Sequence, residues 1–323
     1  MRRIALLLAL GVAACSEPAA PSTDAAPLTR DAGMEAGEDA AHALDAGVTG
    51  GDAASSGAGD AATAERDAAE APGLDASSST KPDAGNASLW KPAPGTSWQW
   101  QLQGTIDTSF DVAMYDVDLF ETPQATIDAL HAAGRTVICY FSAGSYEDFR
   151  SDKGDFPAPV IGKAMDGWAG ESWLDVSNAA LQPVMKARLD LAAQKRCDGV
   201  EPDNMDGYQN DTGFSLTAAD QLAYNRFIAS EAHARGLSVG LKNDIDQLDD
   251  LVADFDWALN EECVKYDECE GYTTSFIAAN KAVFHVEYGT ASLADAVCPK
   301  TQPLRFSTLI KKLGLDAWRV ACP

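Results

Sequence analysis

Acidic side chains gather at two places in the sequence where a buried β-strand is predicted to end. They are Asp198, Glu201, Asp203 and Asp206 in and beside the segment GVEPDNMDGY, and Glu261 and Glu262 after Asn260. Burying a carboxylate costs free energy unless the group is paired or used. Two carboxylates that face one cavity from different strands are the groups that cleavage of a glycosidic bond requires. The sequence therefore predicts acid/base chemistry on a sugar.

Strand-like and helix-like segments alternate along the second part of the chain. The predicted strands are 97–102, 110–117, 136–143, 198–204, 237–243, 256–262, 282–289 and 317–322. Helical patterns lie at 122–134, where Thr122 is the expected cap, at 178–195 and at 216–236. Alternation of this kind predicts a parallel sheet. Eight strands in about 230 residues favour an α/β fold, a closed (β/α)₈ TIM-like barrel that forms one domain.

Two links between these segments depart from a regular barrel. The link between the first two strands is too short for a full helix. Residues 156–178, after the third strand, form an extra segment that is long enough to make a lid or rim. In such barrels the site lies at the carboxyl ends of the strands, and polar residues follow most of the predicted strands. The site is therefore expected at this face.

Six sequence segments carry a family resemblance. In chain order they are TVICYFSAGSYEDFR, GESWLDVSN, DGVEPDNMDGYQND, SVGLKND, NEEC and HVEYG. They resemble glycoside hydrolase family 114, the endo-α-1,4-polygalactosaminidases, from about Trp98 to Tyr288 and beyond. The resemblance implies a TIM-like barrel that hydrolyses α-1,4-linked galactosamine polymers. It also implies two catalytic carboxylates, Asp203 and Glu261, and no cofactor.

The roles of the acidic residues follow in part from their positions. We expect Asp203 to be the nucleophile and Glu261 the general acid/base of a retaining reaction, with the reverse assignment open. Lys242 is expected to lower the pKa of one carboxylate, or to form a structural ion pair. Glu201 is either a buried structural carboxylate or a catalytic one. Glu262 is the alternative second acid, although it points away from Glu261 if the strand continues.

Further residues are expected to bind substrate. They are Asp116, Tyr140, Ser142, Asp206, Tyr208, Lys242, Asn243, Asn260, Glu287 and Tyr288. Asp206 has an alternative role as the cap of the following turn. Aromatic side chains that either stack on sugar rings or belong to the core are Tyr140, Tyr146, Trp168, Trp173, Tyr208 and Tyr288.

The N-terminal part predicts export. Residues 1–14 have the basic, apolar and small-residue order of a signal peptide, and Val12 to Cys15 resembles a lipobox. Cys15 is therefore the expected lipidation site, with a membrane partner through that lipid. Residues 15–89 are rich in Ala, Asp, Gly and Ser, which predicts a disordered acidic linker before a barrel at 90–323. An outer-membrane or cell-surface lipoprotein is expected, because Ser16 does not indicate inner-membrane retention.

The excess of acidic over basic residues favours a cationic partner. The chain has 49 acidic and 24 basic residues, of which 35 and 19 lie in residues 90–323. Such a surface repels nucleic acid and attracts cationic ligands, here an amino-sugar polysaccharide; solubility alone is the alternative explanation. We expect a monomer. The other functions considered are a hydrolase of a different amino-sugar polymer and a non-catalytic carbohydrate-binding surface protein.

Cysteine usage agrees with export. Six cysteines remain beside Cys15, an even number, so disulfides are expected. The favoured pairs are Cys263–Cys269, Cys298–Cys322 and, as the remaining pair, Cys139–Cys197. No metal is expected, because the four histidines are scattered and no CxxC pair is present.

Overall fold

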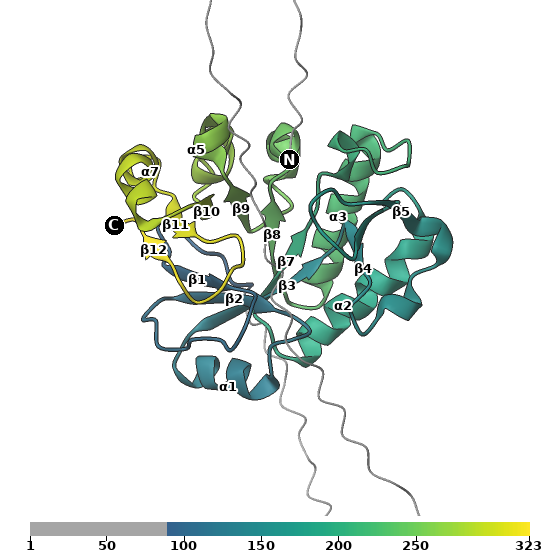
Figure 1. Cartoon of the computed structure of the whole chain (residues 1–323), viewed down its shortest axis with the longest axis horizontal. Helices are drawn as coiled ribbons and strands as arrows, with labels where there is room; N and C mark the ends of the chain where they lie inside the picture. The colour runs from purple at the N-terminus through teal and green to yellow at the C-terminus, as the bar shows by residue number, and fades with distance from the viewer. Residues whose placement is uncertain (1–88) are drawn as a thin grey trace, which may run out of the picture. The chain divides into compact units, whose positions relative to one another are not determined.

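A sheet of parallel strands in chain order forms the centre of the molecule (Figure 1). The computed structural model describes residues 89–323. Eight of its strands run parallel to their neighbours: β1 (Trp98–Gln101), β2 (Met114–Asp118), β3 (Thr136–Ser142), β7 (Gly199–Asp203), β8 (Ser238–Lys242), β9 (Trp257–Glu261), β10 (Val283–Tyr288) and β11 (Ser307–Lys311). The sheet curls as in the expected TIM-like α/β barrel, which confirms the predicted fold class.

The two ends of the curled sheet are joined by side-chain and loop hydrogen bonds. β12 (Val320–Ala321) pairs antiparallel with β11 and forms the last edge of the sheet. From β1, the Trp98 indole N–H donates to the Ser307 carbonyl at 2.8 Å. The Gln99 side chain donates to the Ala317 carbonyl at 3.0 Å. These contacts bring the first strand against the last ones, so the carboxyl ends of all eight parallel strands surround one space.

The prediction of the eighth strand was wrong. It placed the strand at 317–322, whereas the eighth parallel strand is β11 at Ser307–Lys311, and β12 is its short antiparallel neighbour. All five residues of β11 are buried in register with β10. The segment Ala317–Cys322 also has strand character, with Trp318 and Val320, but it lies partly exposed at the edge.

The core has two layers. The inner layer fills the barrel with Trp98, Trp100, Met114, Ile138, Trp257, Leu259, Phe284, Val286 and Leu309. The outer layer packs the opposite strand faces against the helices. Gly240 makes room for the inner layer, because a Cβ there would lie 2.2 Å from the Trp257 ring. Residues of alternating strand positions therefore face alternating layers, as the pleat requires.

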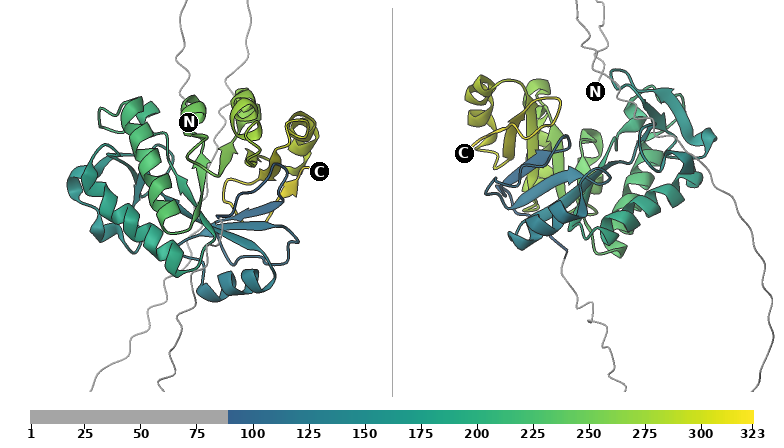
Figure 2. Two further views of the ribbon diagram at one scale, coloured as in Figure 1. Left: turned by 180° about the vertical axis from the view of Figure 1, so that it is seen from behind. Right: turned by 60° about the horizontal axis from the view of Figure 1, so that its bottom comes forward.

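The helices cover the outside of the sheet (Figure 2). They are α1 (Gln124–Ala132), α2 (Gln182–Gln194), α3 (Ala218–Ala234), α4 (Leu248–Leu251), α5 (Cys263–Tyr266), α6 (Cys269–Tyr272) and α7 (Ala294–Thr301), with a π-helical turn at Thr273–Ile277. α3 starts with a capping box between Thr217 and Asp220. The expected Thr122 cap of α1 was wrong: Pro123 occupies the N-cap position without a side-chain bond. No helix in residues 89–323 is long and apolar enough to cross a bilayer.

The extra segment predicted at residues 156–178 provides two strands, β5 (Ile161–Ala164) and β6 (Glu171–Leu174), of a small antiparallel sheet, and the third, β4 (Ser145–Glu147), lies before it. The strand order in this sheet is β4-β6-β5. Three-residue helical turns accompany it at Lys153–Asp155, Ala158–Val160 and Ala179–Leu181. The sheet stands at the carboxyl end of β3, so the prediction of a rim above the barrel agrees with its position.

Three disulfides tie the fold together, in the pairings that the sequence analysis favoured. Cys139 on β3 bonds Cys197, which directly precedes β7. Cys263–Cys269 closes a short loop between α5 and α6, and Cys298–Cys322 ties α7 to the C-terminus. Cys15, the expected lipidation site, and the boundaries 1–14 and 15–89 lie outside the described residues.

Candidate active site

A cleft opens at the carboxyl ends of the parallel strands. Its volume is about 1560 Å³, and side chains from β1, β3, β7, β8, β9, β10 and the small sheet line it. Because each of these strands ends at the same face, residues that are far apart in the sequence meet there. The cleft thus brings together most of the polar strand ends that the sequence singled out.

The ammonium group of Lys242 lies between three carboxylates. Its Nζ is 2.9 Å from Glu201 Oε1, 3.0 Å from Asp203 Oδ1 and 3.3 Å from Glu261 Oε2. Only 2% of the Lys242 side chain is exposed. Burial opposes the charged form, but the negative charges of Asp203, Glu201 and Glu261 outweigh it and raise the Lys242 pKa well above its usual range. Lys242 is therefore a fixed positive charge at the bottom of the cleft.

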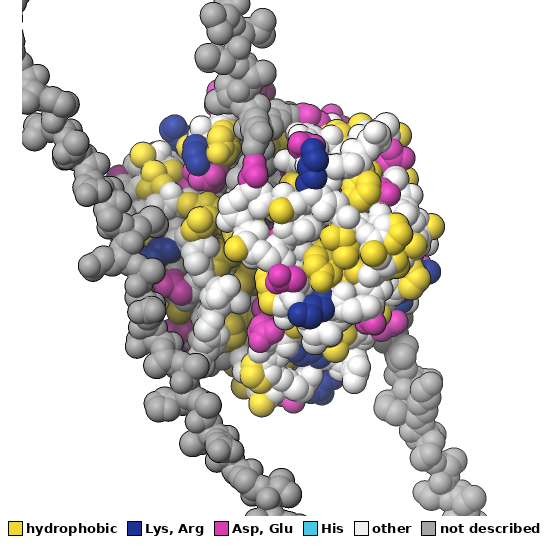
Figure 3. All heavy atoms as spheres, turned by 45° about the vertical axis from the view of Figure 1, so that its right-hand side comes forward, with side chains coloured by type: hydrophobic (Ala, Val, Ile, Leu, Met, Phe, Trp, Pro, Cys, Tyr) yellow, Lys and Arg dark blue, Asp and Glu magenta, His cyan; other side chains and the backbone are white. Residues whose placement is uncertain are grey.

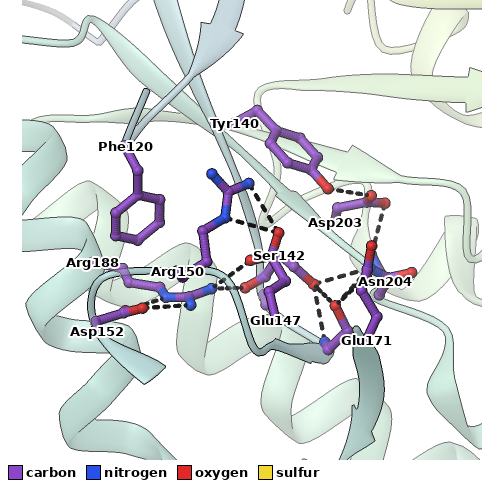
Figure 4. Close-up of polar contacts among 12 residues, drawn as sticks. Phe120, Tyr140, Ser142, Glu147, Arg150, Asp152, Glu171, Arg188, Asp203 and Asn204 are labelled. Atoms are coloured by element: carbon purple, nitrogen blue, oxygen red, sulfur yellow. Dashed lines mark hydrogen bonds and ion pairs between the residues drawn. The ribbon is translucent and has the colours of Figure 1, made fainter. Parts of the chain in front are cut away.

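Asp203 ends β7 and is held by donors on both oxygens. Oδ1 accepts the Asn204 backbone N–H at 2.8 Å as well as the Lys242 ammonium. Oδ2 accepts the Tyr140 hydroxyl at 3.0 Å (Figure 4). Burial and the charge of Asp203 raise the Tyr140 pKa well above its usual range, so the phenol keeps its proton and remains a donor. This set of donors suits a carboxylate anion.

Glu261 ends β9 and, like Asp203, has three donors, of which Lys242 and Asn243 lie farther away than the donors of Asp203. Oε1 accepts the Tyr288 hydroxyl, and Oε2 accepts the Asn243 side-chain amide at 3.3 Å. Burial and the charge of Glu261 raise the Tyr288 pKa well above its usual range. The Glu261 side chain is 26% exposed, compared with 19% for Asp203. Glu261 therefore faces the open part of the cleft more than Asp203 does.

Glu201 lies below the cleft with no exposed surface. Besides Lys242, it accepts the Trp100 indole N–H at 3.0 Å. It does not line the cleft. The geometry thus agrees with the structural role that the sequence left open for Glu201. Glu262, the alternative acid, also lines the cleft; it has a left-handed backbone, and its carboxylate pairs with Lys265 at 2.8 Å.

A network of buried ion pairs links the small sheet to the barrel (Figure 4). Arg150 Nη2 lies 2.7 Å from Asp118 at the end of β2 and 2.9 Å from Glu147 on β4. Arg188 on α2 reaches Glu147 at 3.5 Å and Asp152 at 2.7 Å. Burial raises the Glu147 pKa to about 7, although both arginines oppose this shift. The network fixes one wall of the cleft to β2 and α2.

A second set of contacts links this wall to the strand end that carries Asp203. Ser145 at the start of β4 hydrogen-bonds Ser142 at 2.6 Å and donates to Glu171 on β6 at 2.9 Å. The Asn204 amide donates to Ser142 at 2.9 Å. Burial raises the Glu171 pKa, the Ser145 hydrogen bond opposes this, and the charge of Asp203 adds to it. Glu171 is thus a further carboxyl group of the cleft, supplied by the rim.

The structure brings most of the expected substrate-binding residues to the cleft. Tyr140, Asp206, Lys242, Asn243, Asn260 and Tyr288 line it. Four others do not, for different reasons. Asp116 and Ser142 are fully buried beneath it, and Tyr208 is not part of the lining, although its hydroxyl accepts a hydrogen bond from the lining residue Gln209. Glu287 faces the other way, where it accepts the backbone N–H groups of Val264 and Lys265 at the start of α5.

Aromatic side chains divide into lining and core. Trp168 and Trp173 line the cleft, whereas Tyr146 packs edge-on against Phe156. In residues 89–323 the large apolar side chains that are most exposed are Phe149, Trp168, Tyr266 and Leu313. All four line this cleft, although they come from the small sheet, from α5 and from the loop after β11. Exposed apolar groups are therefore concentrated at the rim.

Sequence reasoning missed several residues of the cleft. Glu147, Arg150 and Glu171 come from the rim, and Asp244 follows β8. Glu147 and Arg150 are three residues apart in SYEDFR directly after β3, and this spacing was the available signal. Glu171 carries no such signal, because its position depends on the pairing of β6 with β4.

One group of described residues has the spacing of metal ligands. Atoms of Cys263, Cys269 and His285 lie within 4.8 Å of one another. The two sulfurs are joined in a disulfide, whereas metals bind the thiolate form of cysteine. In its oxidised form this group does not provide a metal site.

Comparison with known proteins agrees with this geometry. The family model described as glycoside-hydrolase family GH114 matches residues 79–323. No curated protein sequence gives a match. The crystal structure of Aspergillus fumigatus Ega3 in complex with galactosamine is 45% identical, with a TM-score of 0.70, over 72% of this chain and 97% of that one. The glycoside hydrolase domain of PelA from Pseudomonas aeruginosa, 12% identical, shares the fold with a TM-score of 0.57 over 71% and 99% of the chains. The chain therefore belongs to glycoside hydrolase family GH114 and is a glycoside hydrolase.

Proposed function

We propose that this glycoside hydrolase cleaves α-1,4-linked galactosamine polymers with Asp203 and Glu261 as its catalytic pair. The observation that carries the proposal is the Lys242 ammonium, which contacts both carboxylates at the bottom of the cleft. The relative that is 45% identical was crystallised with galactosamine. A hydrolase of this sugar needs two carboxyl groups on either side of the bond that breaks.

The spacing of the pair favours retention. Asp203 Oδ1 and Glu261 Oε2 lie 3.0 and 3.3 Å from one nitrogen atom. The sum of these distances, about 6.3 Å, is therefore the greatest separation of these two inner oxygens, and it sets no limit on the two outer ones. Retaining enzymes place their carboxyl groups ~5–5.5 Å apart and inverting enzymes ~6.5–9.5 Å apart. We infer a retaining reaction through a covalent glycosyl-enzyme intermediate.

The contacts of each carboxylate support different roles. Donors from Tyr140, Asn204 and Lys242 contact both oxygens of Asp203 and hold them in one direction, as a nucleophile requires. Asp203 attacks the anomeric carbon while Glu261 protonates the leaving oxygen. Glu261 then takes the proton of the water that hydrolyses the intermediate. The greater exposure of Glu261 suits this exchange of protons with leaving group and water.

The surroundings of the pair suit a cationic polymer. Further carboxyl groups line the cleft, among them Glu121, Glu171 and Asp206. Acidic and basic side chains are interspersed on the face drawn in Figure 3. We therefore assign the attraction of the substrate's ammonium groups to the cleft and not to the surface as a whole. The exposed Trp168 and Tyr266 at the rim suit stacking on sugar rings beyond the bond that is cleaved.

The site of action is proposed from the N-terminal sequence. The order of basic, apolar and small residues before Cys15 supports export and a lipid on that cysteine. The three disulfides fit an oxidising compartment. We infer a monomeric enzyme, held at the bacterial outer membrane or cell surface, that acts on polysaccharide outside the cell.

The proposal is tested by incubation with defined oligomers. Purified protein is mixed with α-1,4-galactosamine oligomers, with their fully acetylated forms and with neutral α-1,4-galactose oligomers of equal length. Mass spectrometry then identifies the products. Shorter galactosamine oligomers support the proposal. Products from the acetylated oligomers alone would indicate another amino-sugar substrate, and binding without products would indicate a carbohydrate-binding surface protein.

A further inference from the structure

Asp116 is a buried carboxyl group for which the proposed mechanism has no use. It lies in the middle of β2, beside Trp100 of β1 in the strand register, and has no exposed surface. Neither of its oxygens accepts a hydrogen bond from an N–H or O–H group. The carboxyl group of Glu201 reaches the same place, because it accepts the indole N–H of Trp100, the β1 residue that pairs with Asp116. Two carboxyl groups share a hydrogen bond only when one of them carries a proton.

The charges around Asp116 do not allow every acid to ionise. The charged groups that face it are Glu201 and Asp203 from β7 and Lys242 from β8. The same ammonium also serves Glu261. Four carboxyl groups thus depend on one buried cation, and like charges at this spacing in a dry site disfavour one another. One proton is therefore expected within the cluster.

The contacts decide which group holds that proton. Glu201 accepts hydrogen bonds from the Lys242 ammonium at 2.9 Å and from the Trp100 indole at 3.0 Å, and both favour its charged form. Asp116 has no comparable donor. Burial, followed by the negative charge of Glu201, raises the Asp116 pKa well above its usual range.

We propose that Asp116 is a positioning residue that remains protonated in the working enzyme and donates a hydrogen bond to Glu201. Glu201 is thereby held as a carboxylate that offsets part of the Lys242 charge from below. Lys242 then stabilises Asp203 as an anion without preventing Glu261 from holding the proton that a general acid must deliver. The kinetic part of this inference rests on the proposed function. The protonation of Asp116 does not depend on it.

Infrared spectroscopy tests the protonation directly. In the full-length protein at pH 7, we expect a C=O stretching band of a buried carboxylic acid that resists exchange. The spectrum of Asp116→Asn, which keeps the shape, the neutrality and the hydrogen-bond donor of the protonated acid, is subtracted from that of the wild type, so that bands of the other buried acids Asp244 and Glu147 cancel. A band in this difference is expected, and a difference without one would place the proton elsewhere and overturn the proposal.

The pH–rate profile tests the role in positioning. Asp116→Asn should keep the alkaline limb of kcat at the wild-type pH, because its amide still donates to Glu201. Asp116→Ala removes the hydrogen-bond donor to Glu201, and Glu201→Gln removes the negative charge of Glu201. In both variants less of the positive charge of Lys242 is offset. Both should move the alkaline limb to lower pH by about one unit, the effect of 1.36 kcal/mol on a proton equilibrium.

Two results would overturn this role. One is an alkaline limb of Asp116→Asn that moves as far as that of Asp116→Ala. The other is a Glu201→Gln limb that stays in place. If Asp116→Ala fails to fold, the comparison of Asp116→Asn with Glu201→Gln still decides the question. If wild-type protein hydrolyses none of the oligomers, the proposed function fails, while the infrared result still establishes or refutes a protonated Asp116.

Discussion

Lys242 is the residue on which the electrostatics of the cleft depend. Its ammonium contacts Glu201, Asp203 and Glu261, and it also lies over the Trp100 ring at 4.9 Å from the centroid. A buried cation of this kind lets several carboxylates stay close together. The sequence left two roles open for Lys242: lowering the pKa of a catalytic carboxylate, or forming a structural ion pair. In the structure its Nζ contacts Asp203 and Glu261 and also the buried Glu201.

Replacing Lys242 should therefore affect both stability and rate. In Lys242→Met, three carboxyl groups lose their shared cation, so we expect the free energy of unfolding to fall by about 3–5 kcal/mol. We expect kcat/KM to fall by at least about a hundredfold, because charge at the reacting centre is no longer stabilised. Denaturant unfolding and oligomer hydrolysis measure the two effects. Lys186→Met, which removes an exposed partner of Glu231, is the control. A Lys242→Met protein that equals this control would contradict the account.

Asp244 is expected to make stability depend on pH. Burial, followed by the charge of Asp206, raises its pKa to about 8. The unfolded chain releases this proton near about pH 4. Between these pH values the folded protein binds more protons, so the free energy of unfolding falls as pH rises. Asp244→Asn should make this fall less steep in denaturant unfolding at about pH 5 and pH 8. Exposed Asp249→Asn is the control, and an unchanged slope in Asp244→Asn would refute the prediction.

At the scale of elements, the close approach of β4 to the end of β7 positions Asp203. Gly144 lies between β3 and β4, and its backbone N–H donates to the Asp203 carbonyl at 3.1 Å. A Cβ at this position would lie 1.9 Å from the Asn204 carbonyl oxygen. The chain can therefore pass the strand end only with glycine here, and the rim is placed against the catalytic strand.

Gly144→Ala should shift this strand end. We expect a loss of about 1–3 kcal/mol in the free energy of unfolding, the usual range for forcing extra atoms into a packed site. The rate should fall as well, because the Asn204 N–H that holds Asp203 moves with the strand end. Gly154→Ala is a matched control, since a Cβ there meets nothing within 4 Å. Calorimetry and hydrolysis would compare them, and equal behaviour of both variants would exclude a tight contact at Gly144.

The elements also show how far sequence reasoning reaches. Seven parallel strands were predictable, because each one is a buried apolar segment that ends in polar residues. β11 was missed because STLIK is short and the later segment AWRVAC, with Trp318 and Val320, also has strand character. Asp203, Lys242 and Glu261 were predictable from their strand ends. Glu171 was not, because only the pairing of β6 with β4 brings it to the cleft, and Glu287 was misplaced because it caps α5.

At the scale of the molecule, negative charge should select the substrate. Residues 90–323 carry 35 acidic and 19 basic side chains. Cleavage of galactosamine oligomers should therefore weaken as salt rises, since screening acts over ~8 Å at physiological ionic strength. It should also weaken as the substrate is acetylated, because the ammonium charge is lost. Initial rates over a salt series, with partly acetylated oligomers alongside, measure both trends. Rates that depend on neither variable would leave solubility as the explanation of the charge.

The cleft residues named above all belong to the part of the chain that the structure describes. Every residue of the cleft named above falls between Trp100 and Leu313. A protein that begins at residue 89 should therefore hydrolyse oligomers at the rate of the longer chain. Kinetics of the two forms under identical conditions make the comparison. A shortened protein that is folded but slow would show that the preceding residues contribute to the site.

The central claim is that Asp203 and Glu261 perform the hydrolysis. The measurement that tests it most directly is the turnover of Asp203→Asn and Glu261→Gln on galactosamine oligomers, with circular dichroism to establish that both variants are folded. Each change keeps the shape of the side chain but removes the carboxylate. The account predicts that both variants are folded and that each loses several orders of magnitude in kcat. Wild-type turnover in either variant would contradict it and would direct the search to Glu201 or Glu262.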